Sequence, residues 1–140
     1  MTTTTEFTPV TASLVSDENR LDFCPTFFGE SLMMRGERLV FAYMDRLSSD
    51  YDGGYWYFYE LSNGGYYMAP AIDSEMQIEV VGNWFSASMS ADAAGIVATL
   101  FALGQLAAES ESDRLIDCYY KLREFALDHA EAGLILGAID

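Results

Sequence analysis

Basic residues are scarce in this chain of 140 residues, which carries seven Lys and Arg against 22 Asp and Glu and has a formal net charge of −15. They are also unevenly placed, because no Lys or Arg occurs between Arg46 and Arg114. Nucleic-acid backbones and anionic membrane surfaces both attract Lys and Arg. The composition therefore argues against direct nucleic-acid binding and against a membrane partner. A basic protein surface stays open as a partner, and a purely solubilising role for the acids is the alternative.

Histidine and cysteine are nearly absent, which removes most catalytic and metal sites. The single histidine, His129, excludes a multi-histidine metal site and leaves one imidazole base. Cys118 precedes His129 on one predicted helix by about 16 Å along the axis, so the two cannot form a dyad within that helix. A pair of Cys24 with His129 would need a tertiary contact that the sequence does not reveal. We therefore expect no catalytic residue, no metal site, no cofactor and no disulfide framework.

Nucleotide-binding motifs are missing as well. The chain has no Gly-rich loop ending in Gly-Lys-Ser or Gly-Lys-Thr, and no strand-to-helix GxGxxG. A pair of carboxylates acting as acid and base, as in glycosidases, is the one enzymatic alternative. With 22 acids in the chain, two within range of each other would carry little information.

The N-terminus lacks a basic segment followed by an apolar one, so we expect no secretory signal and a cytoplasmic location. Residues 1–19 begin with a Thr-rich run and are predicted to form a flexible N-terminal arm. Residues 20–140 are predicted to form a single domain. The most apolar segment, residues 93–108, is expected to be too short to span a membrane.

Aromatic side chains are what the chain has in abundance, and eight of them fall within residues 51–70. The stretch alternates with period two, which predicts β-strands. If Asn63 and Gly64 form a type I′ turn, Leu61 pairs with Tyr66. Neither face of that hairpin is polar. Because the stretch has no base, ring pairing within a sheet is favoured over a stacking platform for nucleic acid or sugar.

A second hairpin is predicted around Gly82 and Asn83, which suit a type II′ turn that pairs Val80 with Phe85. Its two faces alternate cleanly between apolar and polar, as in an antiparallel sheet with one buried face. The apolar face holds Met76, Ile78, Val80, Phe85, Ala87 and Met89, and the polar face holds Gln77, Glu79, Ser86 and Ser88.

Helical spacing accounts for the remaining segments. Residues 23–51 read as a helical region with a break near Gly29. Ser90 is a good N-cap for an apolar helix, which should be the buried central one. Ser112 caps the last helix, in which Asp117 can pair with Lys121 one turn later. We predict an α+β fold, in which a small antiparallel sheet of two hairpins, with about four strands, packs with about four helices.

Two segments of the sequence are similar to those of a known protein family. The segments "MRGERLVFAYMDRLSSDYDGGYWYFYELSNGGYYMAP" and "SADAAGIVATLFALGQL" resemble the ArdB/KlcA family of antirestriction proteins, and the resemblance runs from about residue 20 to residue 140. Such proteins are carried by plasmids, phages and genomic islands, and they protect incoming DNA from host type I restriction endonucleases. The resemblance implies no catalytic activity for this chain.

The resemblance implies an inhibitor whose partner is the type I restriction-modification enzyme complex. We expect a monomer that acts by protein–protein contact and blocks DNA translocation or cleavage. The alternatives are an acidic mimic of DNA, which is how the separate ArdA family works, and a small carboxylate-based enzyme. A mimic needs carboxylates spaced like phosphates along an extended face, whereas many acids here fall at caps and turns, as Asp52, Asp92 and Asp113 do.

Two acidic sites are candidates for contact with the partner. One is the predicted patch around the aromatic stretch, and the other is the C-terminal carboxylate with the side chain beside it. Ordinary solvation or turn chemistry is the competing interpretation for each residue. The candidate binding residues are Asp50, Asp52, Tyr55, Tyr57, Glu60 and Asp140.

Overall fold

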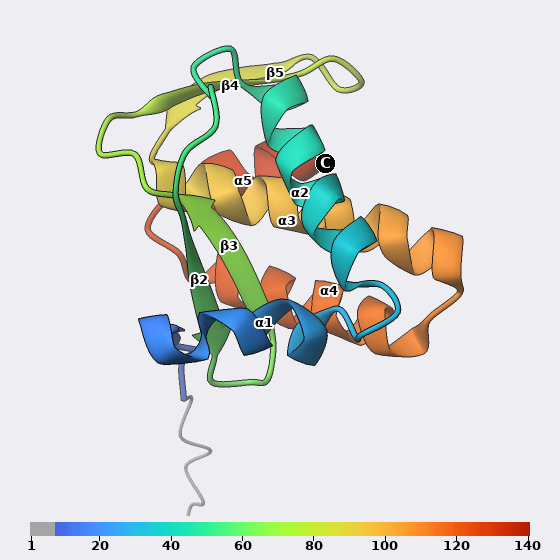
Figure 1. Ribbon diagram of the computed structural model, residues 1–140. Helices are drawn as coiled ribbons and strands as arrows, with labels where there is room; N and C mark the ends of the chain where they lie inside the picture. Colours follow the sequence, from blue (N-terminus) through green and yellow to red (C-terminus); the bar gives the residue numbers. More distant parts are fainter. Residues whose placement is uncertain (1–7) are drawn as a thin grey trace, which may run out of the picture.

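The computed structural model describes residues 8–140 and confirms the α+β class. Within these residues, five α-helices pack with a three-stranded sheet of order β1-β2-β3 and a separate two-stranded sheet β4-β5, all antiparallel (Figure 1). Both predicted hairpins are present, but they lie in separate sheets, and the structure adds strand β1 and a fifth α-helix. The strands are β1 (Ala12–Leu14), β2 (Trp56–Leu61), β3 (Tyr66–Pro70), β4 (Met76–Val80) and β5 (Phe85–Met89). The helices are η1 (Asp17–Asn19, 3-10), α1 (Arg20–Phe27), α2 (Met33–Leu47), α3 (Ala91–Ser110), α4 (Asp113–Leu127) and α5 (Ala132–Ile139).

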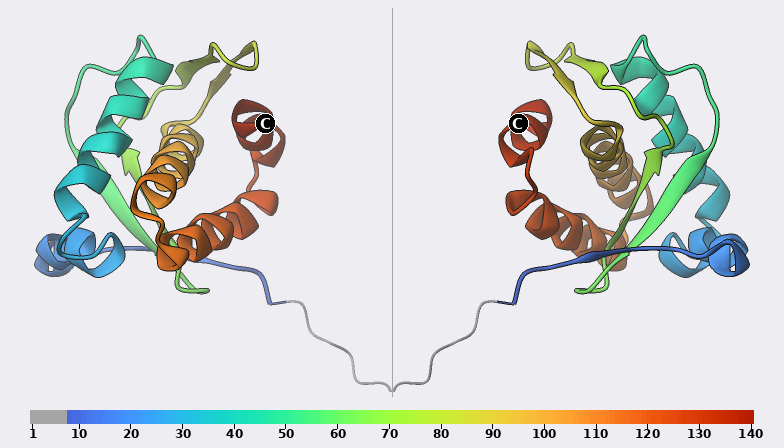
Figure 2. Two further views of the ribbon diagram at one scale, coloured as in Figure 1. Left: turned by 90° about the vertical axis from the view of Figure 1, so that its right-hand side faces the viewer. Right: turned by 90° about the vertical axis from the view of Figure 1, so that its left-hand side faces the viewer.

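Helix α3 runs through the middle of the molecule, with α2, α4, α5 and both sheets around it (Figures 1 and 2). Its N-cap is Ser90, as predicted, and the Ser90 hydroxyl accepts a hydrogen bond from Ala93 N at 3.1 Å. The helix has 20 residues and is apolar enough to cross a membrane, so the expectation that this segment is too short was wrong. However, 72% of its most apolar window is buried inside the fold. This burial is that of a core helix.

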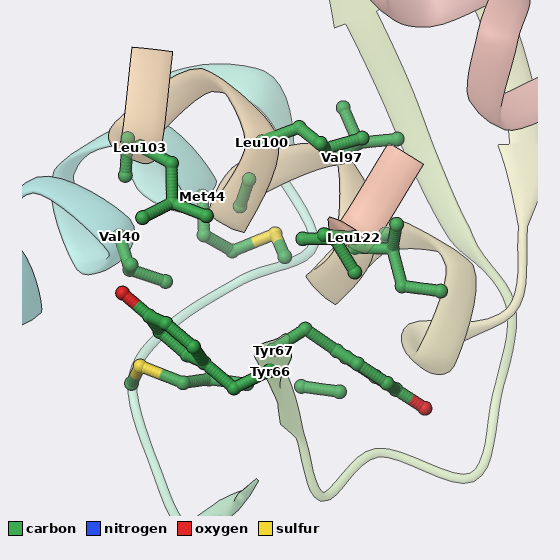
Figure 3. Close-up of a cluster of buried hydrophobic side chains, with 14 of the residues drawn as sticks. Val40, Met44, Tyr66, Tyr67, Val97, Leu100, Leu103 and Leu122 are labelled. Carbon is green, nitrogen blue, oxygen red and sulfur yellow. The ribbon is translucent and has the colours of Figure 1, made fainter. Parts of the chain in front are cut away.

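Strand β3 is buried on both faces over its whole length. Its consecutive residues Tyr66 and Tyr67 point in opposite directions (Figure 3), as neighbours on a strand do. The Tyr66 ring meets Phe28, just after α1, edge-on at 5.3 Å, and the Tyr67 ring stacks on Phe125 of α4 at 5.6 Å. The aromatic stretch is therefore largely core, which is the structural role that period two favoured.

The register of the first hairpin differs from the predicted one by a residue. Tyr66 pairs with Glu60, not with Leu61. Gly64 has a φ of +91° whereas Asn63 has no positive φ, and a type I′ turn requires both. The turn closes instead through Leu61 N to Gly65 O at 2.9 Å, with three residues in the loop. Tyr66 therefore lies on the face of the hairpin that Glu60 occupies, which is opposite to the face of Leu61.

The second hairpin has the predicted faces and the predicted pairing of Val80 with Phe85. Its turn is not type II′, because Gly82 has no positive φ and Trp84 has one, at +63°. Asn83 shapes the turn by accepting a hydrogen bond from Phe85 N at 3.0 Å. The predicted type II′ turn requires a positive φ at Gly82, whereas the structure has it at Trp84.

The N-terminal boundary also differs from the prediction. Residues 1–7 of the predicted arm lie outside the described residues. Residues 12–14 form β1, which pairs with β2, and Val15 N donates to Phe58 O at 2.8 Å. These residues belong to the sheet, so an arm that extends to residue 19 was wrong for this part.

The contact between α3 and β3 depends on one glycine. A Cβ atom at Gly95 would overlap Met68 O and stand 2.5 Å from Ala69 Cα, whereas a Cβ at Gly104 would come no closer than 3.9 Å to its nearest neighbour, on Tyr119. Both glycines lie in α3, where alanine is intrinsically preferred by about 1 kcal/mol.

We therefore predict that Gly95→Ala lowers the free energy of unfolding by about 3 kcal/mol, because helix and strand must separate. Gly104→Ala is the matched control and should raise the free energy of unfolding by about 0.5–1 kcal/mol. Urea denaturation of the two variants measures both values. Equal effects at the two glycines would contradict the close-contact explanation.

Candidate functional site

The predicted acidic patch does not form one cluster. Asp50 accepts a hydrogen bond from Gln77 N at 2.8 Å and so ties the loop before β2 to the start of β4. Glu60 lies at the other end of β2, about 16 Å along the strand from Tyr55. Figure 1 shows the β2–β3 turn and β4 at opposite ends of the molecule. Asp52 is exposed in the loop before β2. These carboxylates cannot bind one small ligand together.

Tyr55 and Tyr57 are exposed and their rings meet edge-on at 5.8 Å. The guanidinium of Arg20 lies 4.3 Å from the centre of the Tyr55 ring and 4.2 Å from that of Phe58, which ties α1 to β2. The Tyr55 hydroxyl is 3.5 Å from Asp17 Oδ1. Both tyrosines therefore belong partly to the packing of the first sheet against α1, and their exposed edges face solvent.

Asp140 follows the last turn of α5 and is exposed. It lies near the β4–β5 turn, because the Asn83 side chain donates to Ala138 O at 2.9 Å. Asp50 and Asp140 thus lie toward opposite ends of the β4–β5 hairpin. The structure does not bring the predicted site residues into one site.

Sequence reasoning missed a polar cluster at the start of α3. Asp92 accepts from the Tyr67 hydroxyl at 2.7 Å and lies 2.8 Å from His129 Nε2. Glu131 N donates to His129 Nδ1 at 3.0 Å, and the Glu131 carboxylate accepts from Ser90 N at 2.9 Å and from the Ser90 hydroxyl. The cluster joins α3, β3 and the α4–α5 connection around the N-terminus of α3.

This cluster explains the one histidine of the chain. Because a backbone N–H can only donate, Nδ1 of His129 must accept and Nε2 carries the proton toward Asp92. Both ring nitrogens are thus occupied by groups of the protein itself. The side-chain partner of His129 is Asp92, 37 residues away in the chain. An imidazole with both nitrogens engaged is not free to act as a general base.

The cysteines are also unsuited to catalysis. Burial, aided by a hydrogen bond from Cys24 Sγ to Glu37, raises the pKa of the Cys24 thiol to about 12. Burial also raises the pKa of Cys118. Both thiols are therefore protonated at neutral pH, and a protonated thiol is a poor nucleophile. No group of three or more His, Cys, Asp or Glu that could hold a metal ion occurs among residues 8–140.

Comparisons with known proteins agree on one family. A family model described as antirestriction protein matches residues 49–140. Antirestriction protein KlcA of Escherichia coli is 58% identical over 140 residues, covering 97% of this chain and 99% of that protein, and a second Escherichia coli KlcA is 56% identical over 138 residues, covering 94% of each. A solved structure is 59% identical with a TM-score of 0.90, covering 99% of this chain and 100% of that one. It comes from work on the KlcA and ArdB proteins, described as showing a novel fold and antirestriction activity against type I DNA restriction systems in vivo but not in vitro.

A double-mutant cycle tests the structural role of the His129–Asp92 pair. We predict that His129→Ala and Asp92→Ala each lower the free energy of unfolding by about 1–3 kcal/mol, because each leaves a polar partner unsatisfied. The double variant should lose less than the sum of the two by about 0.5–3 kcal/mol, which is the coupling energy of neighbours in one network. Additive losses in thermal or urea unfolding would show that the two side chains act independently.

Proposed function

The chain belongs to the antirestriction protein family, and we propose on that premise that it protects incoming DNA from type I restriction enzymes inside the host cell. The observation that carries the proposal is the 59% identical solved structure, which covers 99% of this chain at a TM-score of 0.90. Its described activity is directed against type I DNA restriction systems. The family assignment confirms the resemblance of the sequence to ArdB and KlcA proteins.

We propose that the chain acts by binding protein and not by catalysis. The side chains best suited to chemistry at neutral pH are committed to the fold: His129 holds Asp92, and Cys24 and Cys118 are buried thiols. This commitment supports an inhibitor over the carboxylate-based enzyme that composition left open. The restriction machinery and its DNA meet in the cytoplasm, which we propose as the place of action.

The condition "in vivo but not in vitro" attached to the related structure shapes the mechanism. An inhibitor that occupies the DNA groove of a purified enzyme needs no other component and would act in vitro. We therefore propose that the chain blocks DNA translocation or cleavage by binding a state of the restriction complex that forms in the cell and that the purified enzyme does not reproduce. This preference also disfavours a DNA mimic.

The distribution of acidic side chains supports the same choice. Seven of the 21 acids among residues 8–140 make side-chain contacts within the fold, so these carboxylates serve the structure first. They are Asp17, Glu37, Asp50, Asp92, Glu109, Asp117 and Glu131. A phosphate-like array needs carboxylates that are free along one continuous ridge.

Phage plating tests the proposed function. Expression of the chain in a host with a type I restriction system should raise the plating efficiency of unmodified phage toward that of modified phage. A host with a type II system is the control and should restrict as before. Intact restriction by the type I host, with the folded chain present, would refute the proposal.

Asp140→Asn tests the C-terminal candidate residue. We predict weaker protection in the plating assay and an unchanged melting temperature, because the side chain is exposed. Asp50→Asn is less clean, since Asp50 also accepts from Gln77 N and its loss should cost about 1 kcal/mol of stability. A fall in stability without a change in protection would assign these carboxylates to the fold alone.

A further inference from the structure

The turn between β4 and β5 presents two large apolar side chains to solvent. Trp84 is 94% exposed and Val81 is 90% exposed, and both lie within one four-residue loop, residues 81–84. Figure 1 shows this turn extending beyond the helices at the top of the molecule. We call residues 81–84 the apolar tip. The other tryptophan, Trp56, is 4% exposed and belongs to the core.

The backbone of the apolar tip is strained at the tryptophan itself. Trp84 has a φ of +63°, a left-handed conformation that glycine adopts freely and a bulky side chain does not. Glycine stands two residues earlier in the same loop, at Gly82, which has no positive φ. A bulky exposed residue in such a conformation has an energetic cost with no gain in packing, which points to a role outside the folding of the domain.

The apolar tip is held firmly from behind. The Asn83 side chain donates to Ala138 O at 2.9 Å and to Gly137 O at 3.4 Å, and it accepts from Phe85 N at 3.0 Å. These bonds join the turn to the C-terminal end of α5, which lies on the same side of the molecule in both views of Figure 2. A tip held in this way loses little conformational freedom on binding.

The surface around the apolar tip is hollowed, and most residues that line the hollows are apolar. A hollow of about 260 Å³ lies on one side and one of about 230 Å³ on the other, and both include Glu79 and Val81 in their lining. Glu79 and Asp140 are exposed in this region, and Arg46 is the one base that lines either hollow. An apolar projection on a chain with a net charge of −15 fits an apolar pocket with a basic rim.

We propose that the apolar tip is the element that docks this chain on its protein partner, with Trp84 entering an apolar pocket on a type I restriction enzyme. This inference rests on the proposed function for the identity of the partner. Enzymes that handle DNA carry the basic surfaces that a chain with a net charge of −15 attracts. A second copy of the chain and an anionic membrane are disfavoured as occupants, since the chain has a net charge of −15. Exposed, rigid tryptophans are the side chains most often found at the energetic centre of an interface.

Three variants separate docking from folding in the plating assay. Trp84→Gly removes the ring and suits the φ of +63°, so its melting temperature should equal or exceed that of the parent chain. We expect it to lower protection by about tenfold or more. Trp84→Phe keeps an aromatic ring and should retain part of the protection. Tyr120→Ala is the matched control, since it removes another exposed ring, 62% exposed on α4, and should protect as the parent does.

Fluorescence quenching tests the contact directly. The chain carrying 5-hydroxytryptophan is excited apart from the tryptophans of the partner, and acrylamide quenches Trp84 while the buried Trp56 contributes little. Addition of a lysate from cells that express a type I restriction enzyme should lower the quenching constant several-fold, and a matched lysate from cells that lack the enzyme should leave it unchanged. Unchanged quenching overturns the inference, as does protection of Trp84 that depends only on the chain's own concentration or on added phospholipid vesicles.

The outcomes also separate this inference from the proposed function. Full protection by a folded Trp84→Gly variant overturns the docking role and leaves the antirestriction function standing. If the parent chain itself gives no protection, the proposed function fails. The quenching result then decides the docking role alone.

Discussion

The backbone of α3 at Gly95 lies directly on the main chain of β3, where a Cβ atom would stand 2.5 Å from Ala69 Cα. The hydroxyl of Thr99, one turn later, accepts a hydrogen bond from Met68 N at 3.3 Å and donates one to Gly95 O at 2.8 Å. A side chain of α3 thus provides a hydrogen-bond acceptor for a backbone N–H of β3. Because this contact covers one face of β3 and α1 approaches the other, the strand has no solvent-facing side. The aromatic residues of β3 are a consequence of that double burial, since large rings fill the space on both faces.

The elements with local determinants could be predicted from the sequence. The N-caps Ser90 and Ser112 and the Asp117–Lys121 pair were confirmed, and so were the faces of the β4–β5 hairpin. The register of the β2–β3 hairpin could not be predicted. Alternation of polar and apolar residues specifies a register only when one face of a strand is polar, and both faces of this hairpin are apolar. Strand β1 was missed because its residues are exposed and its only determinant is a pairing with β2, far along the chain.

For the candidate site too, local properties could be predicted from the sequence and long-range contacts could not. The exposure of Asp50, Asp52, Glu60 and Asp140 was predictable from their residue types, but their separation depends on which ends of β2 and β4 they occupy. The Asp92–His129 pair joins residues that are 37 positions apart, and the sequence around either residue does not indicate its partner. The second hairpin was predicted to turn at Gly82 and Asn83 alone. The exposed tip exists because the loop is longer and the positive φ falls on Trp84.

Charge and apolar contact have different tasks in an inhibitor of this composition. The net charge of −15 acts over about a Debye length and speeds the encounter with a basic surface, but it confers little residence time at cellular ionic strength. Residence depends on contacts that exclude water, and affinity differences between related complexes arise mostly in dissociation rates. Among the described residues, the acids that contact other side chains stabilise the fold, whereas Trp84 makes a strained, exposed projection that stabilises nothing within it. An acidic surface that guides the chain to a basic enzyme, and an apolar tip that holds it there, account for both features of the sequence without requiring the carboxylates to imitate DNA.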